Sequence, residues 1–287
     1  MTAIASPAAV STAQSNHTDA RIKPRNRSHD VSSALQGEWL ADDAFLTAFF
    51  NGMSIAFPVG EKFFIDAVRH YADRIADPAL RADIQGFCGQ EGFHRREHQR
   101  YNETLCAARG YDLDALEGPL AGRLDWARKN LSPMKNLAVT IAIEHFTAVL
   151  AEILLRDGSI LDRADPAMRS LWRWHAAEEL EHKSVAFDVY RAVGGSEELR
   201  VAVMRRVSVL LAFELTRTLF TILKRDGKLF NLRLWRRGLA SLFGKQGVFS
   251  GAWPLYRPYY QVGFHPGQQD TRELLVQWGA EPQPSST

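Results

Sequence analysis

Four glutamates and two histidines of this chain have the residue types and the spacing of a metal site. In chain order they are Glu61, Glu91, His94, Glu144, Glu179 and His182. Each histidine follows a glutamate by three positions, and a lone glutamate precedes each such pair by 30 or 35 residues. Residues three apart on a helix lie on one face, so each pair can present a carboxylate and an imidazole to the same ion. One Glu-x-x-His pair alone is weak evidence, but two in the same order indicate helices that enclose two metal ions.

The neighbours of these glutamates favour a buried site over surface ion pairs. Glu61 is followed by Phe63 and Phe64, and Glu144 directly follows the largely apolar run 137–143. A carboxylate in such surroundings is expected to be buried, and a buried carboxylate needs a partner. Carboxylates that bridge two close cations offset their charge, while one imidazole for each metal leaves positions open for oxygen or substrate.

A third histidine, His175, lies four positions before Glu179 and seven before His182, so the three share one helical stripe. Two interpretations stay open for His175: a third imidazole ligand, or a core histidine bonded to a ligand carboxylate. His98 lies one turn beyond His94 and is interpreted as a ligand, an outer hydrogen-bond partner or a surface residue. Four further residues lie beside better candidates and are expected to point elsewhere: Glu97, His145, Glu178 and Glu181.

Helix start and stop signals place the candidate ligands on four helices. Asp77-Pro78, Ser132-Pro133 and Asp165-Pro166 each put a capping side chain before a proline at the first helical position. Gly110 and Gly158 are natural helix ends. The expected helices are 41–57, 60–76, 78–109, 119–130, 133–157, 166–193 and 196–226. The second, third, fifth and sixth of these carry the candidate ligands. Sustained strand alternation is missing, so the sequence predicts an all-α protein: a ferritin-like four-helix bundle with additional helices and an irregular C-terminal extension.

Length and composition bound the class of protein. A chain of 287 residues, 46% hydrophobic and 24% charged, can bury a sizeable core, and its net charge of +2 gives no reason to expect a nucleic-acid partner. The two cysteines, Cys88 and Cys106, lie 18 residues apart on one expected helix. That separation is roughly 27 Å, too far for a disulfide, so a reducing, cytoplasmic setting fits. The longest apolar helix candidate, 201–223, is interrupted by charged residues, so no membrane-spanning segment is expected.

Three regions are expected along the chain. Residues 1–38, rich in Ala, Ser, Thr and charge, predict a disordered tail; residues 39–226 form the di-metal helical bundle; residues 227–287 form a basic and aromatic extension packed on it. Residues 224–265 carry eight Lys or Arg against one acidic residue, a net charge of +7. Together with its aromatic residues, this segment suits either a lid over one end of the bundle or the surface of an anionic membrane. Its glycines and prolines favour the lid.

The stretches around the candidate ligands resemble a family of ferritin-like bacterial proteins described as predicted metal-dependent hydrolases. The matching stretches are residues 60–64, 90–94, 144–148, 174–183 and 263–266. The resemblance runs from about residue 46 to residue 278. The stripe that contains His175 is also similar to the site of the p-aminobenzoate N-oxygenases, whose two irons are bound by four glutamates and three histidines. The resemblance implies the following ligands: Glu61, Glu91, His94, Glu144, His175, Glu179 and His182.

Three functions are compatible with such a site. The first is a non-haem di-iron oxygenase or oxidase, which uses O₂ and an electron donor to oxidise a small organic substrate. The second is a hydrolase that uses a metal-activated water, as the family description states. The third is a non-catalytic, ferritin-like metal-binding protein. The expected cofactor is a pair of iron ions, with manganese or a mixed pair as alternatives that suit the same ligands. A homodimer is compatible with the sequence.

Overall fold

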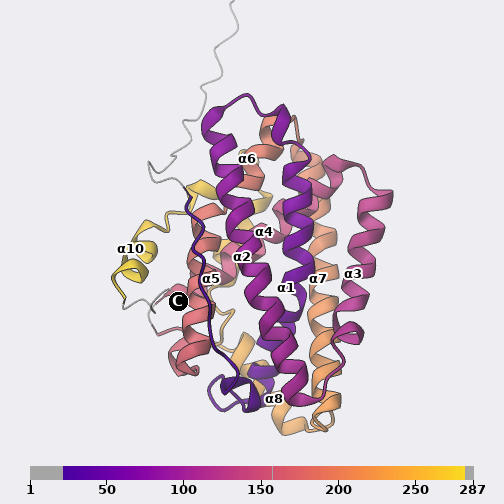
Figure 1. Cartoon of the computed structure of the whole chain (residues 1–287), viewed down its shortest axis with the longest axis vertical. Coiled ribbons are helices and arrows are strands. Elements are labelled where there is room, and N and C mark those ends of the chain that lie inside the picture. The colour runs from indigo at the N-terminus through magenta and orange to yellow at the C-terminus, as the bar shows by residue number, and fades with distance from the viewer. Residues whose placement is uncertain (1–21, 157, 282–287) are drawn as a thin grey trace, which may run out of the picture.

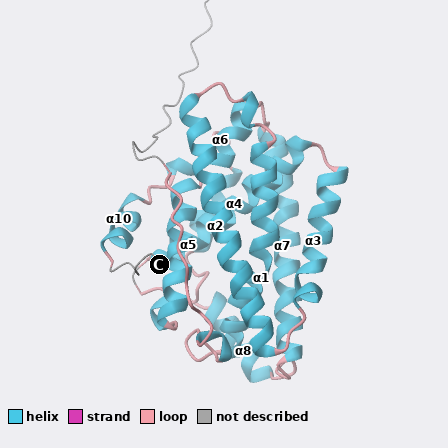
Figure 2. Cartoon of the chain, viewed as in Figure 1, coloured by secondary structure: helices cyan, strands magenta, loops and turns pink. Residues whose placement is uncertain are grey.

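The computed structural model describes residues 22–156 and 158–281, and these residues form helices and no strand (Figure 2). One isolated β-bridge joins Leu40 to Ala164. The all-α bundle predicted from the sequence is confirmed. The α-helices in chain order are α1 Ala44–Arg69, α2 Pro78–Arg109, α3 Leu113–Asn130, α4 Pro133–Leu155, α5 Pro166–His182, α6 Val185–Ala192, α7 Glu197–Arg225, α8 Leu232–Phe243, α9 Ala252–Tyr256 and α10 Arg272–Ala280.

Two pairs of helices form the centre of the bundle (Figure 1). Helix α1 packs along α2, and α4 packs along α5, while α1 also contacts α4 and α2 contacts α5. Helix α3 connects α2 to α4 and lies beside α1 at the outer edge of the bundle, on the right in Figure 1. Helix α7 lies against both α1 and α4 on one side of the bundle. The four central helices are therefore the ones on which the sequence places the candidate ligands.

The expected helix starts are present, with the expected capping. The side chains of Asp77, Ser132 and Asp165 accept hydrogen bonds from backbone N–H groups of the first turn, and each is followed by proline. Helix α2 ends at Gly110, which has a φ of 65°, a conformation that glycine adopts without strain. Local sequence therefore determines where these three helices begin and where α2 ends.

Several expected boundaries are wrong, among them the helix end expected at residue 76, which lies at Arg69. The predicted break between 57 and 60 does not occur, because α1 continues through Pro58. An interior proline costs about 3 kcal/mol, but α1 is buried along most of its length, and that packing outweighs the cost. Helix α3 begins at Leu113 rather than at residue 119. The single helix expected over 166–193 is interrupted at Lys183, whose Nζ donates to the carbonyl oxygen of Gln269 at 2.6 Å.

The N-terminal segment corrects the expectation of a disordered tail through residue 38. Residues 1–21 lie outside the described part of the chain, but residues 22–38 pack along α2 and α5, and Val31 and Leu35 are buried. This contact explains two of the glycines in α2. A Cβ atom at Gly86 or Gly89 would collide with Ile22 or Pro24. These glycines lower the helix propensity of α2 so that the N-terminal segment can lie against it.

The C-terminal extension contains more helix than expected. Helices α8, α9 and α10 lie within the region predicted to be irregular. The guanidinium group of Arg200, fully buried on α7, lies 4.6 Å from the ring centre of Tyr259 and 5.6 Å from that of Phe264. It also donates to the carbonyl oxygens of Tyr259 and Gln261. A buried cation held by rings and carbonyl groups anchors the extension to the bundle.

Helix α4 is long and apolar enough to cross a membrane, by length and composition alone. In the most apolar window of this helix, 61% of the residues are buried inside the protein. Helix α4 contacts α1, α5 and α7, so its apolar composition is that of a central core helix. Both cysteines, Cys88 and Cys106, are free and buried, as expected from their separation.

Candidate metal centre

Four helices bring all seven candidate ligands together at the centre of the bundle. Each residue is at most 4% exposed, and their side chains form two groups whose potential ligand atoms lie within 4.8 Å of one another. The first group is Glu61, His94 and His175. The second group is Glu91, Glu144, Glu179 and His182. Each group contains carboxylate and imidazole, the donor set that suits one iron, manganese or similar ion.

The donor atoms of this cluster lack ordinary hydrogen-bond partners. Among the described residues, both carboxylate oxygens of Glu61, Glu91 and Glu144 are buried without a hydrogen bond. The same is true of His94 Nδ1 and His182 Nε2. Buried polar atoms are nearly always bonded, so a cluster of unpaired acceptors fits the binding of a cation. Four carboxylates would balance the charge of two divalent ions, so the residues fit a dinuclear centre.

Glu179 lies at the middle of the cluster. Its Oε1 atom is 3.0 Å from His175 Nε2, 3.5 Å from His94 Nδ1 and 3.6 Å from His182 Nε2. The first two of these histidines belong to one group and the third belongs to the other. Glu179 is therefore the carboxylate that lies within reach of imidazoles from both groups, and it could contribute to holding ions at either.

Burial controls the protonation of the cluster when no metal is bound. Burial raises the pKa of Glu61 and of Glu144 well above the usual range, and the neighbouring Glu91 adds to both shifts. Burial also opposes a charge on His94, but the hydrogen bond with Glu178 and the nearby carboxylates of Glu179 and Glu91 raise its pKa to about 10. Protons therefore take the place of cations in the metal-free site.

A chain of hydrogen bonds orients His175. Asn102 Nδ2 donates to the carbonyl oxygen of Ser54 at 3.0 Å, so Asn102 Oδ1 accepts from the Ser54 hydroxyl at 2.7 Å. The Ser54 oxygen then accepts from His98 Nδ1 at 2.8 Å, and His98 Nε2 accepts from His175 Nδ1 at 2.7 Å. This order leaves His175 Nε2 without a proton, 3.0 Å from the acceptor Glu179 Oε1. Burial, together with the charge of the nearby His94, lowers the pKa of His175 to about 4, which keeps it neutral.

A similar outer contact orients His182. Gln90 Nε2 donates to Glu181 Oε2 at 2.8 Å, so Gln90 Oε1 faces His182 and accepts from its Nδ1 at 2.9 Å. The Nε2 atom of His182 then points into the cluster, 3.1 Å from Glu91 Oε1 and 3.6 Å from Glu144 Oε2. An outer acceptor of this kind sets which nitrogen of a histidine is available to a metal.

His94 is oriented by Glu178, a carboxylate that was expected from the sequence to point away from the site. Its Nε2 lies 3.1 Å from Glu178 Oε2, and the backbone N–H and guanidinium group of Arg25 donate to Glu178 Oε1, each at 3.1 Å. Burial opposes ionisation of Glu178, but the contacts with His94 and Arg25 outweigh it and lower its pKa. The ionised Glu178 accepts a hydrogen bond from the Nε2–H group of His94. The other ring nitrogen, Nδ1, faces Glu179. The expectation that Glu178 points away from the site is wrong.

The sequence analysis missed the outer partners because they come from distant segments. Arg25 belongs to a region expected to be disordered, and Ser54 and Asn102 carry no motif. His98 is an outer hydrogen-bond partner in the structure, one of its three open interpretations. Glu97 and His145 point elsewhere, as expected: Glu97 accepts from the backbone N–H of His29, and His145 bonds the carbonyl oxygen of Tyr256. Glu181 stays outside the cluster but accepts from Gln90, the residue that orients His182.

The fold and the site together define a helical bundle with a buried candidate centre for two metal ions. The family described as predicted metal-dependent hydrolase matches residues 23–270, and the chain belongs to this family. No curated protein and no solved structure matches the chain.

Proposed function

We propose that this protein is a dinuclear non-haem iron enzyme that activates O₂ to oxidise an apolar organic substrate. The observation that carries the proposal is the orientation of the three histidines. Each has an outer hydrogen-bond partner for one ring nitrogen and directs the other nitrogen into a cluster of four glutamates. Such a cluster is made of acceptors, and acceptors that converge in a dry interior require cations.

The surroundings of the site favour oxygen chemistry over hydrolysis. Trp172 and Trp174 are buried beside the histidines, and the ring of Phe57 lies 4.9 Å from that of His175. A small cavity of about 20 Å³ touches His175 and Glu179, and Thr147 supplies the one hydroxyl group in its lining. Hydrolysis needs a route for water and polar groups to hold an ester or amide, whereas oxidation of a C–H bond needs water kept away.

In the proposed reaction, the residues of the site would have separate roles. The glutamates and histidines would hold two ferrous ions, which supply the electrons and binding positions needed to activate O₂. The outer partners would keep each imidazole in the required tautomer, and the aromatic rings would exclude water. In the net reaction, one oxygen atom enters the substrate and the other leaves as water. Two electrons and two protons come from an external donor.

A hydrolase is the second candidate, because the family description names that activity. In this alternative the two ions would supply an activated water for attack on an ester or amide. Such a reaction consumes no O₂ and proceeds with a redox-inert metal such as Zn²⁺.

Anaerobic loading with ferrous iron tests both candidates. Elemental analysis should give two irons per chain, and Mössbauer spectra should change when O₂ is admitted. The Glu61→Gln variant should lose iron, whereas Glu103→Gln, an exposed glutamate of α2, should match the unmodified protein. Ester hydrolysis by the Zn²⁺-loaded protein, without O₂ uptake by the iron-loaded protein, would reject the oxidative reaction and favour the hydrolase.

A further inference from the structure

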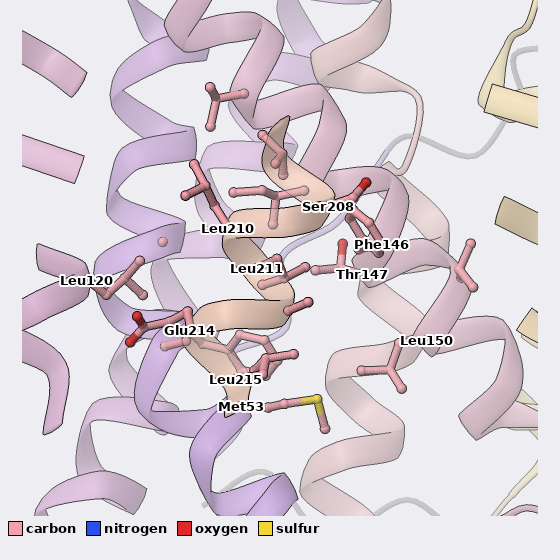
Figure 3. Close-up of a pocket in the computed structure, with 18 of the residues that line it drawn as sticks. Met53, Leu120, Phe146, Thr147, Leu150, Ser208, Leu210, Leu211, Glu214 and Leu215 are labelled. Carbon is pink, nitrogen blue, oxygen red and sulfur yellow. The ribbon is translucent and has the colours of Figure 1, made fainter. Parts of the chain in front are cut away.

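A large cavity lies beneath the middle of α7, and we call it the α7 cavity (Figure 3). Its volume is about 890 Å³, near the upper end of the usual range for small-molecule pockets, about 300–1,000 Å³. Thr147 and Leu150 of α4 line one side, and Leu211 and Leu215 of α7 lie across from them. Met53 of α1 also lines the cavity.

The α7 cavity exists because the middle of α7 does not complete its packing. Val207 and Leu219 are buried against the bundle. Between them, Leu211 and Leu215 face the same side but stay only partly buried. The opposing wall contains Ala56 and Gly60 of α1, which leave the space unfilled. A core helix ordinarily closes such a gap with larger side chains, so the opening indicates a binding site.

The lining of the α7 cavity is almost entirely aliphatic and aromatic. Three of its hydroxyl groups are engaged with other protein groups. The hydroxyls of Ser208 and Tyr256 lie 2.7 Å apart in a hydrogen bond, and Thr147 donates to the carbonyl oxygen of Glu144 at 3.0 Å. Such a surface binds by burying hydrocarbon and offers few hydrogen-bond partners to a sugar, nucleotide or peptide.

The α7 cavity adjoins the candidate metal centre. Phe57, Thr147 and Leu150 line both the α7 cavity and the small cavity that touches His175 and Glu179. The Phe57 ring contacts the ring of His175 directly. A molecule in the α7 cavity is therefore separated from the metal ligands by the Phe57 side chain.

One edge of the α7 cavity carries a positive charge. Arg123 of α3 lines the cavity and pairs with Glu214, which also accepts from Arg217 at 2.5 Å. Two guanidinium groups share one carboxylate, so this edge has a net charge of +1 and can bind an anion. The nearby Trp126 and Leu210 are 58% and 53% exposed. An apolar rim with a cationic edge suits an amphiphile.

We propose that the α7 cavity binds a long-chain carboxylate of the fatty-acid class. The carboxylate lies at Arg123 and the hydrocarbon chain extends under α7 toward Phe57. This inference rests on the proposed function only for the reaction of the bound molecule, whose hydrocarbon end would be oxidised. The binding itself depends on the cavity and needs no turnover.

Displacement of a fluorescent fatty acid, cis-parinaric acid, from the full-length protein measures the binding. We expect palmitate to bind at least tenfold more tightly than octanoate, because each additional buried methylene group stabilises the complex. Ala56→Trp fills the cavity and should weaken palmitate binding at least tenfold. The matched control is Ala107→Trp on the exposed surface of α2, which should leave binding unchanged.

A second variant tests the position of the carboxylate. Arg123→Gln should weaken palmitate binding at least fivefold and leave hexadecanol binding unchanged. In Mn²⁺-loaded protein, the NMR signal of palmitate labelled with ¹³C at its methyl end should broaden more than that of palmitate labelled at its carboxyl carbon. If Ala56→Trp fails to fold, Leu211→Trp provides the same test from the opposite wall.

The outcomes separate this inference from the proposed function. No palmitate binding by a protein that holds two irons overturns the inference and leaves the metal centre intact. Equal palmitate binding by wild type and by the folded Ala56→Trp variant overturns it as well. Palmitate binding that Ala56→Trp abolishes, in a protein that shows no reaction with O₂, supports the inference and rejects the oxidative function.

Discussion

Replacement of His98 by leucine tests whether the outer hydrogen bonds control the metal centre. The substitution removes the acceptor of the His175 Nδ1 proton at 2.7 Å and leaves the Ser54 oxygen without its imidazole donor. A buried group left without a partner costs about 1–3 kcal/mol, and loss of an outer partner of a ligand histidine typically weakens metal binding about 10–100-fold. The second figure corresponds to about 1.4–2.7 kcal/mol.

The His98→Leu effect should be confined to one metal position. His98 contacts His175, which belongs to the group with Glu61 and His94. We therefore expect one of two metal-binding constants to fall about 10–100-fold while the other changes by less than about threefold. Anaerobic titration with Co²⁺, followed by visible absorption and by calorimetry, measures both constants.

His145→Leu is the matched control for this experiment. His145 is also a buried histidine, but it bonds the carbonyl oxygen of Tyr256 and packs against Tyr259. The control should lower the free energy of unfolding and leave both metal-binding constants unchanged. If His98→Leu lowers stability by the same amount as the control and also leaves both constants unchanged, the proposed role of the hydrogen-bond chain is refuted.

Four further predictions concern the site and the surface. Glu144→Ala should lose at least one metal per chain, because no nearby carboxylate can replace it; full metal content by elemental analysis would remove Glu144 from the site. Arg25→Ala should weaken metal binding several-fold through Glu178 and His94, with Arg25→Lys restoring part of it; equal affinities in the three proteins would contradict this. Burial raises the pKa of the Glu144 carboxyl group, so metal binding should release protons and strengthen as pH rises; a pH-independent affinity would count against a buried, protonated site. Residues 224–265 should not bind anionic vesicles at low salt if they act as a lid, and salt-reversible co-sedimentation would favour the membrane alternative.

The sequence was informative where a property depends on a few neighbouring residues. The Glu-x-x-His pairs predict shared helix faces from the helical repeat, and the Asp-Pro and Ser-Pro pairs predict the starts of α2, α4 and α5. The burial of Glu61 and Glu144 follows from their apolar neighbours. All seven candidate ligands converge in the structure, although their binding to a metal remains a prediction.

Packing reversed the sequence interpretation where local and long-range preferences compete. The position of Pro58 predicts the end of a helix, yet α1 continues because residues on both sides of Pro58 are buried in the core. Gly86 and Gly89 lower the helix propensity of α2, but their lack of a side chain admits Ile22 and Pro24. A propensity of about 1 kcal/mol per residue is smaller than the free energy gained by burying an apolar side chain.

By itself, the sequence determined which residues could bind metal and on which helices they lie, because carboxylates and imidazoles at three-residue spacing share one helix face. Only the tertiary structure decided the tautomers of the histidines and the position of the α7 cavity beside the site. The partners of His94, His175 and His182 come from other segments of the chain, and the α7 cavity is lined by residues of α1, α3, α4 and α7. These features depend on distances between residues far apart in sequence, which only packing of the helices can set.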